Sequence, residues 1–153
     1  MFNIVLVHPD IPQNTGNIVR TCAATGSILH LIKPLGFSIS DKYLKRAGLD
    51  YWSHATVKIY ESFEEFEIKN MEGSYFLATS KGSRLFTDFE YKDGAYIIFG
   101  SETKGLPDYI HEKYWQNRIR IPMREGIRCL NLANSAAIVL YEAERQNRFK
   151  GLI

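Results

Sequence analysis

The apolar run YIIF at residues 96–99 is the feature of this sequence that most limits its fold. Four consecutive residues of this kind are typical of a strand covered on both faces, and such strands belong mainly to parallel sheets with helices on either side. A polar segment bounded by Gly100 and Gly105 follows the run directly. Open α/β sheets bind ligands at the carboxyl ends of their strands, and glycine lets a backbone approach a ligand closely. The segment therefore predicts a small-molecule site.

Three known loop motifs do not account for the segment GSETKG at residues 100–105. A phosphate-binding P-loop requires Lys and then Ser or Thr after its second glycine, whereas Leu106 and Pro107 follow here. The nucleophile elbow G-x-S-x-G does not match the segment, and the dinucleotide fingerprint G-x-G-x-x-G occurs nowhere in the chain. Taken alone, the segment is equally typical of an ordinary connection between a strand and a helix.

The length of the chain predicts a single domain spanning residues 1–153, which is long enough to bury a hydrophobic core. No apolar run approaches the roughly 18 to 20 residues of a membrane-spanning helix. The N-terminal segment has no basic stretch before its short apolar run, so it does not resemble a secretion signal. We therefore expect a cytoplasmic protein that does not insert into a membrane.

The cysteine and histidine residues are too scattered to indicate a metal site. Cys22 and Cys129 stand far apart without C-x-x-C spacing, and the four histidines do not cluster. We expect neither a disulfide framework nor a bound metal.

Local charge is more informative than the net charge of +2, which is too small to indicate nucleic acid by itself. Lysine and arginine gather in three segments, which is consistent either with ordinary solvated surface or with a phosphate-bearing partner. These segments contain Lys42, Lys45 and Arg46; Arg118, Arg120, Arg124 and Arg128; and Arg145, Arg148 and Lys150.

Strands and helices are predicted to alternate along the chain, which indicates an α/β fold with a mostly parallel sheet flanked by helices. Strands are expected at residues 2–7, 28–32, 56–60, 74–79, 95–99 and 117–121. Helices are expected near residues 14–25, 41–47 and 63–68, after Pro107 with Tyr109 and Ile110 pointing inward, and at residues 131–147.

The first predicted helix carries a polar amino terminus. Asn14 or Thr15 is expected to cap its start and Gly26 its end. Together with Asn17 these side chains would offer amide and backbone N–H groups to an anion, and Arg20 would lie one turn beyond Asn17. The alternative is an ordinary capped helix with an arginine on its surface.

The last predicted helix has a face of small residues, which is typical either of core packing or of a dimer surface. We expect a dimer surface, and we expect Glu144 to pair with Arg148 on the outside. The face consists of Ala133, Ala136, Ala137, Leu140 and Ala143.

Three segments together go beyond these general patterns. They are NTGNIVR at residues 14–20, FGSETKG at 99–105, and IPM at 121–123 followed by RCLNLANSAA at 128–137. In order and spacing they resemble the three signature motifs of the SPOUT class of RNA methyltransferases, and KRAGLDY at residues 45–51 extends the similarity over nearly the whole chain. The sequence most resembles the subfamily that methylates the ribose 2′-OH of the tRNA wobble nucleotide, cytidine or uridine 34.

The resemblance implies an α/β domain with a deep C-terminal trefoil knot, a feature too rare to be inferred from composition. It also implies S-adenosylmethionine as methyl donor, with S-adenosylhomocysteine as product. The position of Cys129 is usually Ser in close relatives, so a contact through the backbone would survive the exchange and one through the hydroxyl would not. The residues that match cofactor-binding positions are Ala78, Thr79, Gly100, Glu102, Gly105, Ile121, Cys129 and Leu130.

By the same resemblance Arg20 and Asn17 are the catalytic residues. A guanidinium stays protonated at ordinary pH, so we expect Arg20 to orient the ribose hydroxyl and phosphate and to stabilise the developing oxyanion. Glu102 would orient its loop or face the sulfonium. The expected substrate-binding residues are Asn14, Arg20, Lys42, Arg46, Arg124, Arg128 and Tyr141.

The partners implied are tRNA and a second copy of the chain, joined through the last helix and residues 14–20, so that Tyr141 could reach the substrate across the dimer. Two alternatives remain open. One is a 2′-O-methyltransferase of another tRNA or rRNA position, and the other is a non-catalytic RNA- or nucleotide-binding domain.

Overall fold

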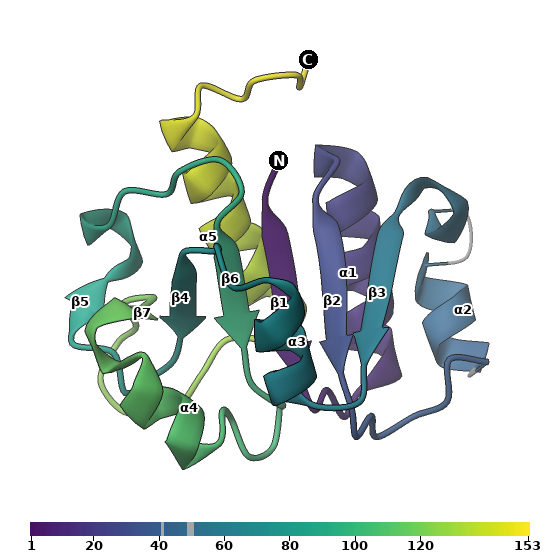
Figure 1. The fold of residues 1–153 in the computed structure, drawn as a ribbon, viewed down its shortest axis with the longest axis horizontal. Helices are drawn as coiled ribbons and strands as arrows, with labels where there is room; N and C mark the ends of the chain where they lie inside the picture. Colours follow the sequence, from purple (N-terminus) through teal and green to yellow (C-terminus); the bar gives the residue numbers. More distant parts are fainter. Residues whose placement is uncertain (41, 49–50) are drawn as a thin grey trace.

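The computed structural model describes residues 1–40, 42–48 and 51–153, and this part of the chain forms one parallel sheet with helices on both faces (Figure 1). The strands are β1 Asn3–Val7, β2 Ile28–Ile32, β3 Thr56–Tyr60, β4 Tyr75–Ala78, β5 Arg84–Leu85, β6 Tyr96–Phe99 and β7 Arg118–Arg120. The helices are α1 Pro12–Thr25, α2 Lys42–Gly48, α3 Phe63–Lys69, α4 Asp108–Lys113 and α5 Leu132–Gln146, with 3-10 turns at Trp52–His54, Phe86–Asp88 and Trp115–Asn117. The predicted α/β class is confirmed.

The order of the strands across the sheet is β3-β2-β1-β6-β4-β7-β5, and the pairings are parallel. Strand β6 is inserted between β1 and β4, with Asn3 opposite Tyr96 on one side and Tyr75 opposite Tyr96 on the other. The run YIIF is therefore a central strand, as its composition predicts. The two-residue strand β5, at the edge next to β7, was not predicted, because so short a segment has no recognisable alternation.

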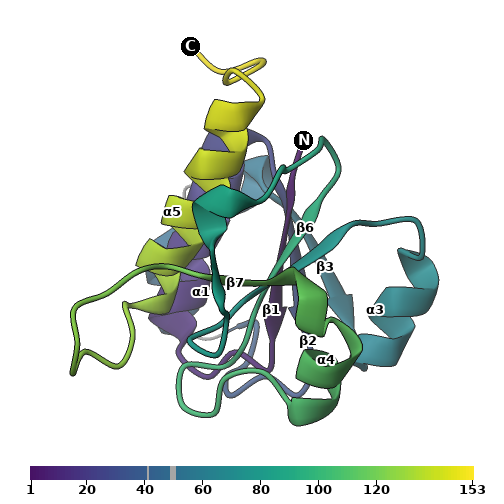
Figure 2. The ribbon, with the colours of Figure 1, turned by 90° about the vertical axis from the view of Figure 1, so that its left-hand side faces the viewer.

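Alternate residues of β6 belong to different hydrophobic clusters on the two faces of the sheet. Ile97 and Phe99 join the cluster that includes residues of α1 and α5. Ile98 joins the cluster that includes Phe63 of α3 and Ile110 of α4. Figure 2 shows the sheet with α1 and α5 on one side and α3 and α4 on the other. The strand is apolar throughout because both of its faces are covered.

Helix α1 begins two residues earlier than predicted. Ile11 is the N-cap residue and Pro12 occupies the first turn, where its fixed φ and missing N–H are tolerated. The predicted caps Asn14 and Thr15 are instead buried within the helix. The end is as predicted, since Gly26 adopts a left-handed conformation with φ 70° and donates its N–H to the Cys22 carbonyl. Helix α2 packs against α1; residue 41, predicted to begin that helix, lies outside the described residues.

The small-residue face of α5 is core packing, so the expectation that it forms a dimer surface is wrong. Ala133, Ala136, Leu140 and Ala143 are buried in the cluster shared with α1. Ile138 and Tyr141 are exposed on the same helix. Small residues on this face let the helix approach α1 and the sheet closely.

Two other predicted side-chain orientations are also wrong. Glu144 is only 5% exposed, and Arg148 has left the helix at a φ of 58°, so the expected external pair does not form. The observed ion pair on α5 is Arg145 to Glu142, with Nε and the carboxylate oxygen 2.7 Å apart. On α4, Ile110 is buried as expected but Tyr109 is 56% exposed, because α4 is a short helix with only one side on the sheet.

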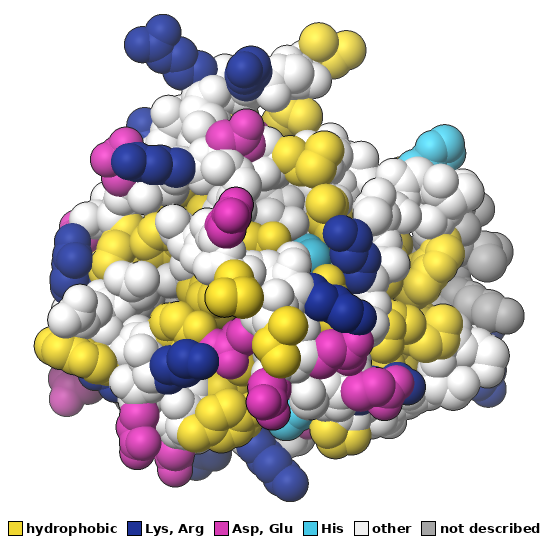
Figure 3. Space-filling view, viewed as in Figure 1, with side chains coloured by type: hydrophobic (Ala, Val, Ile, Leu, Met, Phe, Trp, Pro, Cys, Tyr) yellow, Lys and Arg dark blue, Asp and Glu magenta, His cyan; other side chains and the backbone are white. Residues whose placement is uncertain are grey.

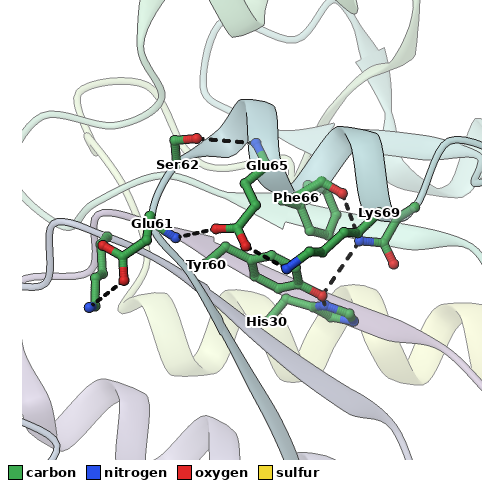
Figure 4. A network of polar contacts seen from close by, with 9 residues as sticks. His30, Tyr60, Glu61, Ser62, Glu65, Phe66 and Lys69 are labelled. Atoms are coloured by element: carbon green, nitrogen blue, oxygen red, sulfur yellow. Dashed lines mark hydrogen bonds and ion pairs between the residues drawn. The ribbon is translucent and has the colours of Figure 1, made fainter.

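A buried polar network crosses β1, β2 and β3, and Figure 4 shows the part of it that joins His30 to Tyr60. The Asn3 amide donates to the Gly94 carbonyl, so its oxygen accepts from Nε2–H of His30 at 3.0 Å. The other ring nitrogen, Nδ1, accepts from the Tyr60 hydroxyl, also at 3.0 Å. Burial, assisted by the charge of Lys58, lowers the pKa of His30 from 6.5 to about 3. His30 is therefore a neutral structural histidine.

Helix α3 begins beside this network, and its cap is visible in the same view. The Ser62 hydroxyl accepts from the Glu65 backbone N–H at 3.1 Å, and the Glu65 carboxylate accepts from the Glu61 N–H at 2.7 Å. The first bond satisfies a donor that a helix start leaves unpaired, and the second pairs the N–H of the residue before the cap. Among the described residues, no helix is both long and apolar enough to cross a membrane.

Candidate active site

A cavity of about 540 Å³ lies at the carboxyl ends of β4, β6 and β7. Most of its wall is formed by the segments that follow these three strands and by the start of α5. Ile11 and Asn14 at the start of α1 and His111 of α4 complete it. The carboxyl edge of a parallel sheet is where open α/β folds bind small molecules, and the volume lies within the ~300 to 1,000 Å³ typical of such sites. This cavity is called the strand-end pocket below.

All eight residues that the resemblance assigns to the cofactor line the strand-end pocket. They come from segments far apart in the sequence, which the strand order brings to one edge of the sheet. These residues are Ala78, Thr79, Gly100, Glu102, Gly105, Ile121, Cys129 and Leu130.

The loop after β6 is closed by its own backbone. The N–H of Ser101 donates to the Gly105 carbonyl at 3.2 Å, and the N–H of Gly105 donates back to Ser101 at 2.9 Å. A Cβ on Gly100 would lie 2.1 Å from the carbonyl carbon of Gly105 and 2.2 Å from the nitrogen of Leu106. Gly100 is thus required for the loop to fold, whereas the sequence suggested only that it admits a ligand. Gly105 is needed for a different reason, its φ of 69°.

The carboxylate of Glu102 is bound to the amino terminus of α1. It accepts hydrogen bonds from the backbone N–H groups of Asp10 at 2.8 Å and Ile11 at 3.2 Å, and from the side chain of Asn14 at 3.1 Å. The start of a helix favours a negative charge because its N–H groups are unpaired. The anion expected at this helix start is therefore a side chain of the protein itself. Of the two roles expected for Glu102, the structure supports the one that orients the loop.

Asn14 extends this connection to α5. Its amide oxygen accepts from the side chain of Asn131 at 2.8 Å, and the oxygen of Asn131 accepts from the N–H groups of Ala133 and Asn134, which caps α5. Both ends of the Asn14 side chain are thus engaged, which makes it a support of the pocket and leaves little of it to bind a substrate. Asn131 was not among the predicted site residues. The sequence feature that could have indicated it is its position directly before the last helix, where asparagine is a favoured cap.

Arg20 and Asn17 lie on the exposed side of α1 and are not part of the pocket wall. Arg20 comes six residues after Asn14, which places it about 9 Å further along the helix axis and on another face. Its Nη2 donates to the hydroxyl of Tyr51 at 3.1 Å, and its guanidinium carbon lies 4.6 Å from the centre of the Tyr51 ring. Tyr51 was not predicted as a site residue, although it ends the segment KRAGLDY.

The predicted RNA-binding cations are exposed but lie in different places. Arg128 lines the strand-end pocket, while Arg124 is exposed in the segment before it. Lys42 and Arg46 are exposed on α2, which packs on α1; none of the described side chains of α2 lines the pocket. The side chain of Lys45 lies outside the described residues. Tyr141 is 46% exposed on α5 and also lies outside the pocket wall.

The pocket wall contains more cations than the sequence indicated. Lys81, Lys104 and Arg120 line it together with Arg128, whereas Glu102, the acidic residue of the described wall, is held by backbone N–H groups. A cationic wall favours a polyanionic partner. On the face covered by α3 and α4, by contrast, basic and acidic side chains are interspersed (Figure 3).

His111 of α4 is a further wall residue that the sequence did not indicate. It is 7% exposed, and its Nδ1 has no hydrogen-bond partner in the described part of the chain. Burial lowers its pKa, and the charges of Lys81 and Arg118 lower it further. His111 is therefore neutral near pH 7.

The two cysteines differ in environment. Cys129 is exposed in the pocket wall, whereas Cys22 is buried in the core, where burial raises its thiol pKa to about 12. Within the described ranges, no group of three or more His, Cys, Asp or Glu residues could hold a metal ion.

Comparison with known proteins supplies the relatives of this chain. Residues 1–141 match the SpoU rRNA Methylase family. The chain is 48% identical to a tRNA (cytidine(34)-2′-O)-methyltransferase of Methylovorus glucosotrophus over 100% of both chains. It is 45% identical to the enzyme of the same name from Burkholderia ambifaria, with 99% of each chain covered.

Solved structures agree with this relationship. A structure described as "structural insights into the 2-OH methylation of C/U34 on tRNA" superposes with a TM-score of 0.93 at 40% identity, covering 97% of each chain. An AdoMet-bound rRNA methyltransferase from Sinorhizobium meliloti shares the fold, with a TM-score of 0.84 at 24% identity over 94% of this chain and 56% of that one.

Proposed function

Since this chain belongs to the SpoU rRNA methylase family, we propose that it transfers a methyl group from S-adenosylmethionine to the ribose 2′-oxygen of nucleotide 34 of tRNA, a cytidine or uridine. The observation that carries the proposal is near-complete coverage at 40 to 48% identity by relatives named for this reaction. The matched regions span the segments that line the pocket and helix α1, which supports a common reaction.

The strand-end pocket fits the proposed methyl donor. Ala78, Ile121 and Leu130 offer apolar walls for an adenine ring, while exposed backbone groups of the three strand-end loops offer hydrogen bonds. The eight lining residues named above would hold the cofactor. When bound, S-adenosylmethionine supplies an electrophilic methyl group and leaves as S-adenosylhomocysteine.

Arg20 is the residue proposed to act on the RNA. Its guanidinium keeps its charge at ordinary pH, so it stabilises the negative charge that develops on the 2′-oxygen as the hydroxyl proton passes to water or to a phosphate, and it orients the neighbouring phosphate. Asn17, exposed one turn earlier on α1, would hold the nucleotide. Both contributions are alignment and charge stabilisation, with no covalent intermediate on the protein.

A homodimer would bring these residues to the chemistry. Arg20 and Asn17 lie outside the pocket wall of their own chain, so we propose that each pocket receives them from a second copy. The interface would use residues 14–20 and the exposed side of α5, where Ile138 and Tyr141 present apolar surface. In this arrangement Tyr141 would approach the RNA across the dimer. The buried alanine face of α5 is not available for it.

The RNA would be bound chiefly through its phosphates. Lys42, Arg46, Arg124 and Arg128 are exposed, and the affinity they give should fall as salt rises. With tRNA as its substrate, the protein would act in the cytoplasm.

We also propose that the chain is knotted, as the family resemblance implies. Insertion of β6 between β1 and β4, followed by the crossing to β7, supports this path. Chains closed into a ring from the folded state would stay more compact in denaturant than rings closed from the unfolded state. Equal hydrodynamic radii would contradict a knot.

Mass spectrometry of tRNA nucleosides and of oligonucleotide fragments tests the proposed reaction. Purified protein, labelled S-adenosylmethionine and unmodified tRNA should give 2′-O-methyl label at nucleotide 34, and tRNA from cells lacking the protein should lose it. Label at another position of tRNA or rRNA would assign a different target. Cofactor binding without transfer to any RNA would indicate a non-catalytic domain.

A further inference from the structure

We propose that Tyr51 is a positioning residue that holds the guanidinium of Arg20 in its working orientation. This inference rests on the proposed function, because it concerns how Arg20 is presented to the RNA. Tyr51 has no role assigned by the resemblance to the family.

Two different contacts join Tyr51 to the same guanidinium. The hydroxyl accepts a hydrogen bond from Nη2 at 3.1 Å, which fixes one edge of the guanidinium plane. The ring lies 4.6 Å from the guanidinium carbon, which adds a cation–π attraction. Together they restrict both the position and the rotation of the group.

Tyr51 is itself anchored to the fold. It precedes the 3-10 turn Trp52–His54, and its carbonyl accepts from the His54 N–H at 3.0 Å. The next residue, Trp52, packs against the hydrophobic cluster on the α1 side of the sheet. A half-buried aromatic ring on such a turn is a rigid support for a mobile side chain.

Support of this kind matters because Arg20 is exposed on α1. A long side chain in solvent samples many rotamers, and the transition state must order it unless the protein has already done so. The hydroxyl of Tyr51 accepts from only one of the five N–H donors of a guanidinium. The arrangement thus orders the group and leaves it able to donate to a phosphate and a ribose oxygen.

The rival explanation is that Tyr51 contacts the RNA itself, for example by stacking on a base. The two roles differ in what they change. Loss of an RNA contact raises KM for tRNA, whereas loss of a support for Arg20 lowers kcat and does so only when Arg20 is present.

The test is a double-mutant cycle with Tyr51→Phe, Tyr51→Leu and Arg20→Gln, measured as kcat and KM for tRNA at saturating S-adenosylmethionine. Tyr51→Phe keeps the ring and removes the hydroxyl, so we expect kcat to fall roughly three- to tenfold. Tyr51→Leu removes both contacts and should lower kcat further, with KM changed less than twofold. In the Arg20→Gln background, Tyr51→Leu should change kcat less than twofold.

Tyr109→Phe is the matched control, since it removes a hydroxyl from an exposed tyrosine that lies outside the site and should leave kcat unchanged. Thermal unfolding of each variant separates folding from function, and Tyr51→Phe carries the test if Tyr51→Leu unfolds.

Three outcomes would overturn the inference: an unchanged kcat in Tyr51→Phe and Tyr51→Leu, a rise confined to KM for tRNA, or an equal loss in both backgrounds. If Arg20→Gln has too little activity for the cycle, the split between kcat and KM in the single variants decides. Full activity of Arg20→Gln would instead refute the proposed role of Arg20 in the reaction.

Discussion

The side-chain amide of Asn14 donates a hydrogen bond of 3.1 Å to the carboxylate of Glu102, and this contact fastens the loop after β6 to the first helix. The same asparagine accepts from Asn131 at the start of α5. Three segments that surround the strand-end pocket are thus held by one short chain of polar side chains. The geometry of the pocket should therefore depend on residues that need not touch a cofactor.

Glu102→Gln should weaken this connection without changing its shape. An amide retains one oxygen acceptor but loses the negative charge at the helix start, so we expect about 1 to 2 kcal/mol of lost stability. Denaturant unfolding measures the stability, and calorimetry should show weaker binding of S-adenosylmethionine. Unchanged stability and affinity would mean that the Glu102 contacts contribute nothing to the pocket.

Gly100→Ala should disrupt the loop itself. The added Cβ would lie 2.1 Å from backbone atoms of the loop, which cannot move independently. We therefore expect the free energy of unfolding to fall by about 3 kcal/mol or more and the binding of the cofactor to be lost. Gly105→Ala is the comparison, because it meets no atom within 4 Å and only strains a φ of 69°. That strain should cost about 1 kcal/mol. Equal losses in the two variants, measured by urea unfolding, would contradict the steric explanation.

The stability of the protein should fall between neutral and mildly acidic pH because of His30. Its pKa is about 3 in the folded state and about 6.5 in the unfolded chain. Between pH 6.5 and 3 the imidazole of His30 gains a proton in the unfolded chain but not in the folded one. The contribution of His30 to the free energy of unfolding is therefore complete above pH 6.5 and is lost as the pH falls toward 3. The free energy of unfolding should fall by about 1.4 kcal/mol per pH unit in this range, which amounts to about 2 kcal/mol between pH 6 and 4.5.

His30→Gln is the control for this prediction, since glutamine does not titrate. This variant should be less stable than the wild type at pH 7, but its free energy of unfolding should change less between pH 6 and 4.5. Parallel curves of unfolding free energy against pH would assign the dependence to other groups, such as His111, whose pKa is also lowered.

Arg20→Ala should lower methyl transfer at least a hundredfold while leaving the binding of S-adenosylmethionine within twofold, since Arg20 lies outside the pocket wall of its own chain and is proposed to act on the RNA. Arg84→Ala is a matched control. Arg84 also donates to an oxygen, the Asp88 carbonyl at 2.8 Å, and lies 3.9 Å from the centre of an aromatic ring, that of Phe89. Normal transfer in Arg20→Ala would remove this residue from the reaction.

Cys129 should report occupancy of the pocket. A maleimide should label Cys129, which is exposed, and leave Cys22 untouched in the folded protein. Saturating S-adenosylmethionine should slow the labelling at least severalfold, as followed by intact-protein mass spectrometry. Equal rates with and without the cofactor, in protein shown by calorimetry to bind it, would place the cofactor away from Cys129.

The class of fold was predictable because it depends on local composition. Continuous apolar strands such as residues 96–99, and helix ends such as Gly26, express burial and backbone preferences within a few residues. Strands β2 and β3 match their predicted bounds for this reason. The edge strand β5 has no such signal.

The partners of each polar side chain were not predictable in the same way. Asn14 has the composition of a helix cap, yet it bridges Glu102 and Asn131, because the strand order brings three distant segments to one edge of the sheet. The alanines of α5 suit a dimer surface or a core equally well, and only the position of α1 beside the sheet decides between them.

The sequence by itself determined that this chain forms a parallel α/β sheet, and its motifs indicated which residues would gather at the carboxyl edge. Tertiary structure decided that Gly100 is needed for the close packing of its own loop and that the Glu102 carboxylate binds the start of α1. It also decided that Arg20 contacts Tyr51 outside the pocket. The reason is that burial patterns are encoded over a few neighbouring residues, whereas contacts between distant side chains depend on the order of strands across the sheet.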